Sequence, residues 1–387
     1  MLAADAVGVD VVAAGAAGAA VEGDPASPSG SFLLQWHITD RCNLRCAHCY
    51  GTPGPDVLDL AGWLAILEDF RSFLKTPCSW GGPPIRGHIT LAGGEPLLHP
   101  EIRRFIAVLA LHRRELSFAI LTNGTFIDGA FAGFLAEAGP AFVQVSLDGR
   151  PAVHDQIRGS GAHAAAAGIR HLVRAGVPTF IAFTVHRRNL GELRPVIRIA
   201  RWLRVDRVWA DRMIPAGRGA RMAHECLSPA ETLLFLNTLN AEHQRAKGWF
   251  GGRTEVAMHR ALQFLAGGTP YRCTAGRTLL ALLPDGTVLP CRRMPVPVGN
   301  LRRTPLLDIY RKNRFLDELR RPGRIDPVCS ACPHWFRCGG GLRCLSYAVY
   351  GDPFGADPGC PLAGRHRILE SGLTGLNERT GGVVLSA

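Results

Sequence analysis

Cysteine is the residue type whose spacing points most directly to chemistry in this chain. The sequence holds 12 cysteines, of which Cys42, Cys46 and Cys49 lie close together near the start. Seven more fall in the C-terminal third, at Cys273, Cys291, Cys329, Cys332, Cys338, Cys344 and Cys360. In a chain without a recognisable secretory signal, such clusters favour metal ligation over disulfides.

The first cluster has the spacing Cys42-x3-Cys46-x2-Cys49. Three thiolates this close can bind three irons of one [4Fe-4S] cube and leave the fourth iron free for another ligand. A zinc ion with His48 as the fourth ligand is the alternative. The spacing alone leaves both interpretations open.

The segments around this cluster alternate between strand and helix patterns. Strands are expected at 32–38, 88–91, 117–121, 142–146, 179–185 and 207–211. Helices are expected at 59–75, 101–112, 128–137, 162–175 and 191–203, with a sixth opening at a Ser228–Glu231 capping box. The fold class is therefore α/β, a partial (β/α)6 TIM-like barrel whose parallel sheet closes only part of the way round.

The alternation stops near residue 250, and residues 271–365 are rich in Cys, Gly and Pro. Short strands are expected there at 278–283 and 287–290. Because this segment has little apolar periodicity, it needs a metal or covalent staple. We expect a disordered segment at 1–30, the barrel at 31–249, a small Cys-rich domain at 250–365 and a tail at 366–387.

Polar motifs follow the expected strands, where a parallel barrel places its active site. Gly93, Gly94 and Glu95 end the second strand, and glycines allow close backbone approach to a ligand while Glu95 offers a carboxylate to an ammonium group. Ser146 ends the fourth strand and Arg158 follows it. Taken singly, these two could also be a turn serine and a surface arginine.

Together these motifs resemble the radical S-adenosylmethionine (SAM) superfamily, in which an aromatic residue, here Tyr50, follows the Cys triad. The resemblance implies that the triad holds a SAM-binding [4Fe-4S] cluster. It implies that Gly93, Gly94 and Glu95 bind the SAM amino group, and that Ser146 and Arg158 bind its ribose or carboxylate. It also implies the reaction, in which the reduced cluster cleaves SAM and a 5′-deoxyadenosyl radical abstracts a substrate hydrogen.

The C-terminal cysteines resemble the SPASM domain, an auxiliary iron-sulfur module. This implies one or two auxiliary clusters, with Cys329, Cys332, Cys338 and Cys360 on the outer one and Cys273, Cys291 and Cys344 on the inner one. Five residues separate Cys338 from Cys344 where the module usually has three, and the inner set is one Cys short. Cys226 is a remote candidate for it; otherwise Cys78 and Cys226 are ordinary thiols. A zinc ribbon over 329–344 remains an alternative.

Radical SAM enzymes that carry a SPASM domain modify peptides and proteins, so the resemblance implies a substrate of this class. The sulfatase-maturing branch usually has a basic Asp after the second SPASM Cys, whereas this chain has Arg292. We therefore expect a crosslink or thioether in a ribosomal precursor peptide, with no catalytic residue assigned. Formylglycine formation and a non-catalytic iron-sulfur protein are the alternatives. Expected partners are an electron donor such as flavodoxin or ferredoxin, and a separate leader-binding protein, since 30 residues before the barrel are too few for a leader-binding domain.

Composition and charge limit the classes of protein and partner that remain. The net charge of +12 comes almost wholly from arginines that are scattered through the expected helices. This distribution favours a solvated surface over a nucleic-acid site, and an acidic peptide partner also fits it. No apolar run reaches the roughly 18 residues of a membrane span. The first residues lack the basic start of a signal peptide. A cytoplasmic protein is expected.

Overall fold

The computed structural model describes residues 31–52, 54–76, 86–247, 254–258, 261–268, 272–321 and 324–363. The expected N-terminal segment at 1–30, the tail at 366–387 and Cys78 lie outside these residues.

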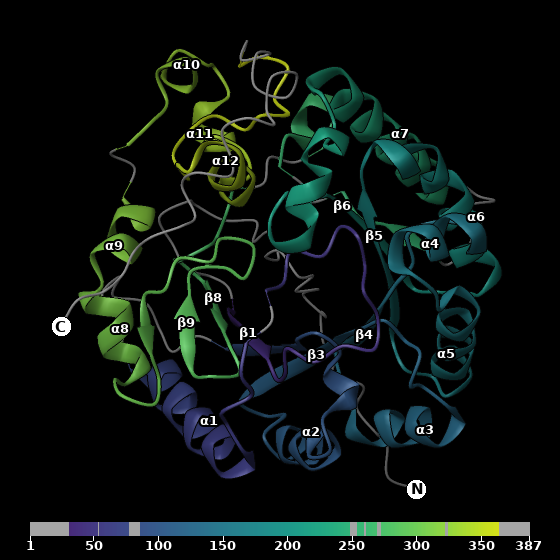
Figure 1. Cartoon of the computed structure of the whole chain (residues 1–387), viewed down its shortest axis with the longest axis vertical. Coiled ribbons are helices and arrows are strands. Elements are labelled where there is room, and N and C mark those ends of the chain that lie inside the picture. Colours follow the sequence, from purple (N-terminus) through teal and green to yellow (C-terminus); the bar gives the residue numbers. More distant parts are fainter. Residues whose placement is uncertain are drawn as a thin grey trace, which may run out of the picture.

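Six parallel strands form the centre of the molecule, as the alternating pattern predicts (Figure 1). They pair in sequence order, each with the next. Their bounds are β1 (Phe32–His37), β2 (Gly87–Ala92), β3 (Leu116–Thr122), β4 (Phe142–Ser146), β5 (Thr179–Val185) and β6 (Arg207–Arg212).

The sheet continues beyond these six strands. The strands expected at 278–283 and 287–290 are present, but the sequence patterns did not predict that they join this sheet. At one end, β7 (Glu255–Val256) pairs in parallel with β6. At the other, β8 (Leu279–Leu282) pairs in parallel with β1, and β9 (Thr287–Leu289) and β10 (Gly299–Asn300) follow as antiparallel strands. All four residues of β8 are buried, so the Cys-rich region contributes a strand to the same sheet.

Helices cover the outer face of the sheet (Figure 1). Asp59 and Asp128 cap two of them by accepting hydrogen bonds from backbone N–H groups, and the reciprocal Ser228–Glu231 capping box is present. The short α4 was not predicted. The bounds are α1 (Leu60–Lys75), α2 (Ile102–Leu111), α3 (Gly129–Ala138), α4 (Pro151–Arg158), α5 (Ala162–Arg174), α6 (Leu193–Trp202) and α7 (Pro229–Lys247).

Side-chain alternation in the strands separates an apolar outer face from a more polar inner one. In β1, Trp36 packs with its ring centroid 5.0 Å from that of Phe105 in α2, which places His37 on the opposite face. Phe142 and Phe180 stack at 4.5 Å near the starts of β4 and β5. The inner face is thus apolar at the strand starts and carries polar groups toward the strand ends.

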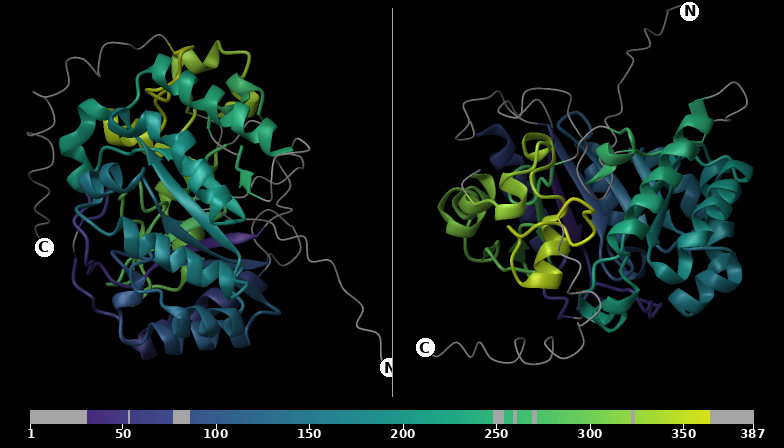
Figure 2. Two further views of the ribbon diagram at one scale, coloured as in Figure 1. Left: turned by 90° about the vertical axis from the view of Figure 1, so that its right-hand side faces the viewer. Right: turned by 90° about the horizontal axis from the view of Figure 1, so that it is seen from above.

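Further helices lie in the C-terminal region, where no regular helices were expected. Tyr310 of α8 packs edge-on against Phe32 and Phe73, and therefore docks this region on α1. Seen from above, the yellow and light green C-terminal region lies on the β1 side of the sheet (Figure 2). The bounds are α8 (Leu306–Lys312), α9 (Arg314–Arg320), α10 (Pro327–Ser330), α11 (Trp335–Cys338) and α12 (Arg343–Tyr350).

Four 3-10 helices complete the described elements: η1 (Pro96–Leu98), η2 (Arg187–Glu192), η3 (Gly217–Glu225) and η4 (Gln263–Ala266). Among the helices in the described ranges, none combines the length and the apolar character that crossing a bilayer requires.

Candidate functional site

The loop that carries Cys42, Cys46 and Cys49 follows β1 and is held from two sides. The N–H of Ala47 donates to Ile157 O of α4 at 2.8 Å, and the N–H of Gly219 in η3 donates to Cys49 O at 3.0 Å. Burial raises the pKa of the Cys46 thiol, and the nearby Arg158 charge opposes that shift. Ionisation of the Cys46 thiol at neutral pH would therefore be favoured by the positive charge of a metal centre.

The end of β2 lies directly against this loop. The N–H of Gly94 donates to Thr39 O at 2.7 Å, and that of Glu95 donates to Arg41 O at 2.8 Å. A Cβ atom at Gly94 would lie 2.3 Å from Arg41 O, so only glycine allows this approach. The predicted glycine motif and the Cys loop are therefore one structural unit.

The Glu95 side chain is fully buried at the strand ends. Its carboxylate accepts hydrogen bonds from Thr122 Oγ1 at 2.8 Å, the Asn123 N–H at 2.7 Å and the Leu97 N–H at 3.1 Å. Burial raises the pKa of Glu95 to about 7, although these hydrogen bonds oppose the rise. The hydrogen bonds hold the carboxylate in one orientation, and the Arg158 charge makes a smaller contribution against the rise in pKa.

Arg158 lies beside the Cys loop and forms an ion pair with Asp148, a residue that the sequence analysis did not identify as functional. Its Nε donates to Asp148 Oδ2 at 2.6 Å, and its Nη1 lies 3.8 Å from Cys46 Sγ. His48 Nε2 lies 3.5 Å from the same Asp148 oxygen. Asp148 belongs to the Ser-Leu-Asp-Gly sequence at the end of β4. Its position just before the helix that carries Arg158 is the sequence feature that could have identified it as a functional residue. Arg158 thus bridges Asp148 and Cys46, and its role toward SAM stays a prediction.

Ser146, the other predicted SAM contact, is half-buried as the last residue of β4. Across the barrel end, the 213–219 segment reaches the Cys loop, since a Cβ atom at Gly217 would lie 2.8 Å from Tyr50 and Gly51 backbone atoms. The strand ends, the Cys loop and this segment therefore converge on one end of the barrel.

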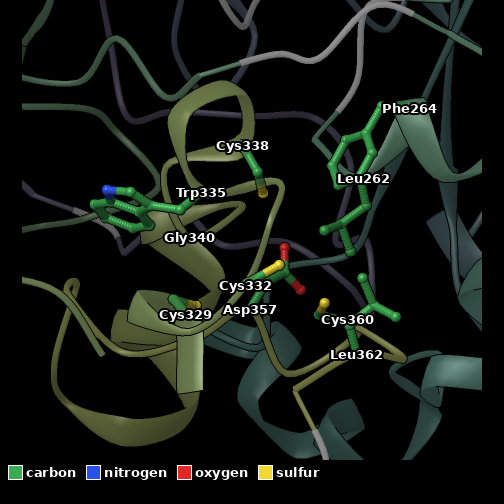
Figure 3. A pocket seen from close by; sticks show the side chains of 10 residues that line it. All are labelled: Leu262, Phe264, Cys329, Cys332, Trp335, Cys338, Gly340, Asp357, Cys360 and Leu362. Atoms are coloured by element: carbon green, nitrogen blue, oxygen red, sulfur yellow. The ribbon is translucent and has the colours of Figure 1, made fainter. Parts of the chain in front are cut away.

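The four cysteines predicted for the outer cluster line one pocket. Cys329, Cys332, Cys338 and Cys360 surround the same space, next to the Asp357 carboxylate (Figure 3). Leu262, Phe264 and Leu362 provide an apolar wall. Burial raises the pKa of Cys338 to about 12. Four thiols around one apolar pocket match the ligand set of an iron-sulfur cube.

The three cysteines predicted for the inner cluster are also neighbours. Burial raises the pKa of Cys291 to about 11, and the Cys273 thiol adds to that rise. Cys344 is buried in α12, and burial raises the pKa of its thiol, with Cys291 as the next largest cause of the rise. The unusual spacing before Cys344 therefore still brings this thiol to the inner set. Cys226 instead packs with Met213 and Met222.

The arrangement of the cysteines can be compared with that expected for a zinc ion and for an iron-sulfur cluster. Within the described residues, no three Cys, His, Asp or Glu side chains converge as the ligands of one metal ion do. Ligands of a cube each bind a different iron and lie farther apart than ligands of a single ion. The triad, the outer set and the inner set agree with the predicted grouping of the thiols, and their assignment as cluster ligands stays a prediction.

Comparisons with known proteins agree with this arrangement. The radical SAM superfamily matches residues 36–200, and SPASM, an iron-sulfur cluster-binding domain, matches residues 273–333. Pre-heme d1 synthase of Dinoroseobacter shibae is 29% identical over 367 residues, covering 85% of this chain and 86% of that protein. PqqA peptide cyclase of Streptomyces rochei is 28% identical over 362 residues, covering 90% and 94%.

The fold is shared with Streptococcus suis SuiB bound to S-adenosylmethionine, at a TM-score of 0.68 and 15% identity over 86% of this chain and 78% of SuiB. The first match lies within the barrel and contains Cys42, Cys46 and Cys49. The second lies within the Cys-rich region and contains Cys273, Cys291, Cys329 and Cys332. This chain is therefore a radical SAM enzyme with a C-terminal SPASM domain, and its cofactors are SAM, a SAM-binding [4Fe-4S] cluster and auxiliary iron-sulfur clusters.

Proposed function

We propose that this enzyme modifies a side chain of a ribosomal precursor peptide by forming a crosslink or thioether. The observation that carries the proposal is the presence of two further thiol sets beside the barrel end, one of four cysteines and one of three. A reaction that removes two electrons from its substrate needs an acceptor for the second one. Auxiliary clusters are suited to that task.

The chain's own residues would bind and orient the reactants. Cys42, Cys46 and Cys49 would hold the SAM-binding cluster, and the fixed Glu95 carboxylate would orient the SAM ammonium group. When bound, cluster and SAM supply a 5′-deoxyadenosyl radical that takes one hydrogen atom from a substrate carbon. The stacked rings of Phe142 and Phe180 would keep water from entering the barrel at the end where the strands start.

The proposed bond formation balances as a two-electron oxidation. Joining two groups of the peptide removes two hydrogens. One would leave as a hydrogen atom, and the other as a proton to solvent and an electron. An auxiliary cluster held by Cys329, Cys332, Cys338 and Cys360 would be suited to accept that electron. An external donor such as flavodoxin or ferredoxin would supply the electron that cleaves SAM. A separate leader-binding protein is the further partner that we propose.

Arg292 weighs against formylglycine formation. Its guanidinium is 2% exposed and stands at the position of the expected sulfatase-type base. Arginine keeps its proton in proteins, so it cannot accept one from a substrate. A heme precursor is the second candidate substrate, and the likeness to Pre-heme d1 synthase over 85% of the chain favours it.

The test is anaerobic co-expression with the small peptide encoded beside the gene, followed by mass spectrometry. The expected product is lighter by about 2 Da, the mass of two hydrogens lost in such radical chemistry. The variant C329A should still cleave SAM but leave the peptide unmodified, because the outer set would be incomplete. An unchanged peptide, together with conversion of a heme precursor by the same preparation, would replace the proposal by the second candidate.

A further inference from the structure

Among the residues that the structure describes, Arg292 is a buried cation without a closely paired carboxylate. Its side chain is 2% exposed, and its Nε has no hydrogen-bond partner. Its Nη2 lies 3.5 Å from Thr52 O and 3.9 Å from Asp40 Oδ1, which are long contacts. Because a buried charge is costly unless it is paired and hydrogen-bonded, this guanidinium has unused capacity for an anion.

Other buried arginines at this end of the molecule are closely paired. Arg158 lies 2.6 Å from Asp148, and Arg212 lies 2.6 Å from Asp357. Arg293, which follows Arg292 in the chain, forms an ion pair with Asp211 of β6. Arg292 differs from each of these arginines because its nearest carboxylate within the described ranges, that of Asp40, lies 3.9 Å away, beyond hydrogen-bonding distance.

A second buried polar group lies next to Arg292. His37 ends β1 with 3% of its surface exposed, and its Nε2 has no hydrogen-bond partner in the part of the chain that the structure describes. Burial, aided by the Arg292 charge, lowers the pKa of His37 well below its usual range. The ring is therefore neutral, and it can offer one N–H donor without adding charge.

Arg292 lies between the inner cysteine set and the Cys triad. Arg292 directly follows Cys291 of the inner set. On its other side, a Cβ atom built at Gly51 would lie 3.7 Å from Arg292 Nη2 and 3.5 Å from Cys49 Sγ of the triad. A group bound by Arg292 would therefore lie near the place where hydrogen abstraction occurs.

We propose that Arg292, assisted by His37, binds a carboxylate of the substrate and thereby selects which substrate carbon faces the SAM-binding centre. A planar guanidinium matches a carboxylate with two parallel hydrogen bonds. The inference rests on the proposed function, in which the carboxylate belongs to an Asp or Glu side chain or the C-terminus of the peptide. A heme precursor with propionate groups would present the same chemistry.

The test measures binding to the reconstituted holoenzyme with SAM present and without reductant. One arm uses the small peptide encoded beside the gene and a version with every carboxyl converted to an amide. The other arm uses coproporphyrin III and its tetramethyl ester. The wild type should bind the acid about tenfold more tightly than the neutral partner in one arm, the worth of a charge-assisted hydrogen bond.

The variant R292Q should lose this preference, and R292K should keep part of it because the charge remains. R303Q, which changes an exposed arginine of the same region, should keep the full preference. Iron content and SAM-induced changes in the cluster's electron paramagnetic resonance spectrum verify that R292Q is intact. If R292Q fails to assemble, the comparison of R292K with the wild type decides.

The outcomes separate the two proposals. A preference for the acid confined to the porphyrin arm keeps Arg292 as the carboxylate-binding residue and removes the peptide assignment. Equal behaviour of acid and neutral ligands in both arms, absence of binding included, overturns the role of Arg292. A preference that persists in R292Q with normal iron content overturns it as well.

Discussion

Glu95 shows how burial and charge oppose each other at a single residue. Its pKa of about 7 means that SAM-free protein is partly protonated there near neutral pH. The SAM ammonium group favours the ionised form, so binding below pH 7 releases a proton. We expect the apparent Kd for SAM to fall by up to about tenfold per pH unit as pH rises toward 7, and to level off above it. Equilibrium titrations across this range test the sign.

The variant E95Q keeps the shape of the side chain but loses its charge. We expect SAM affinity to weaken by about 1.5 to 3 kcal/mol, the value of a hydrogen bond to a charged group. The pH dependence described for the wild type should disappear in the same titrations. A Kd that is unchanged and still depends on pH would show that another group binds the ammonium.

The thiols of Cys42, Cys46 and Cys49 are the predicted ligands of the SAM-binding cluster. The variant C42A/C46A/C49A should form no 5′-deoxyadenosine and should lose about one cube's worth of iron while keeping the auxiliary iron. C226A is the matched control, because this thiol packs with Met213 and Met222 and should leave iron content unchanged. Iron analysis and chromatography of the SAM products measure both. Wild-type SAM cleavage in the triple variant would refute the assignment.

At the scale of elements, the contact between the end of β2 and the Cys loop is the most constrained feature. The variant G94A would place a methyl group 2.3 Å from Arg41 O and 2.7 Å from Asp40 O, both backbone atoms. The loop must then shift, and Cys42 shifts with it. We expect SAM affinity to fall by at least about tenfold, or 1.4 kcal/mol.

Gly133 provides the control for that substitution. It lies in α3, and a Cβ atom there meets nothing within 4 Å. G133A should therefore leave SAM binding unchanged and stabilise the fold by about 0.5 to 1 kcal/mol, because alanine favours helix. Calorimetric SAM binding and denaturant unfolding of both variants give the comparison. Equal SAM affinity of G94A and G133A would contradict the steric argument.

At the scale of the whole molecule, the Cys-rich region contacts both sides of the partial barrel. It supplies β8 to pair with β1, and its Asp357 accepts hydrogen bonds from Arg212 of β6 at 2.8 and 2.6 Å. Asp357 also accepts from the Leu342 N–H at 2.9 Å and lines the outer thiol pocket. This carboxylate therefore links barrel docking to the outer cluster site.

The variant D357N should destabilise the protein by about 3 to 5 kcal/mol, because it leaves the Arg212 charge buried without its partner. The outer cluster should also load less iron. D352N is the control, since Asp352 pairs with Arg324 at 3.2 Å on the surface and its loss should cost less than about 1 kcal/mol. Denaturant unfolding of the holoenzyme measures both. Equal effects of the two substitutions would rule out a special role for Asp357.

Much of the fold and of the site could be predicted because the signals are local. The apolar periodicity located β1 to β6 and most of the helices between them. The Cys42-x3-Cys46-x2-Cys49 spacing, together with the glycine motif after the second strand, predicts where the SAM-binding cluster is held. The α4 helix escaped because eight residues after a proline show too little periodicity. The C-terminal helices escaped for a similar reason, since most of them are short.

The sequence by itself determined which residues can ligate metal, in what order they occur and which strand ends carry them. Only the tertiary structure decided that β8 joins β1, that Cys344 reaches the inner set, and that Arg212 meets Asp357 across 145 positions of the chain. It also decided that Arg292 is buried with Asp40, at 3.9 Å, as its nearest carboxylate among the described residues. Ligand spacing and periodicity act over a few residues and can be read from the chain, whereas the pairing of distant strands and charges depends on how the whole barrel packs.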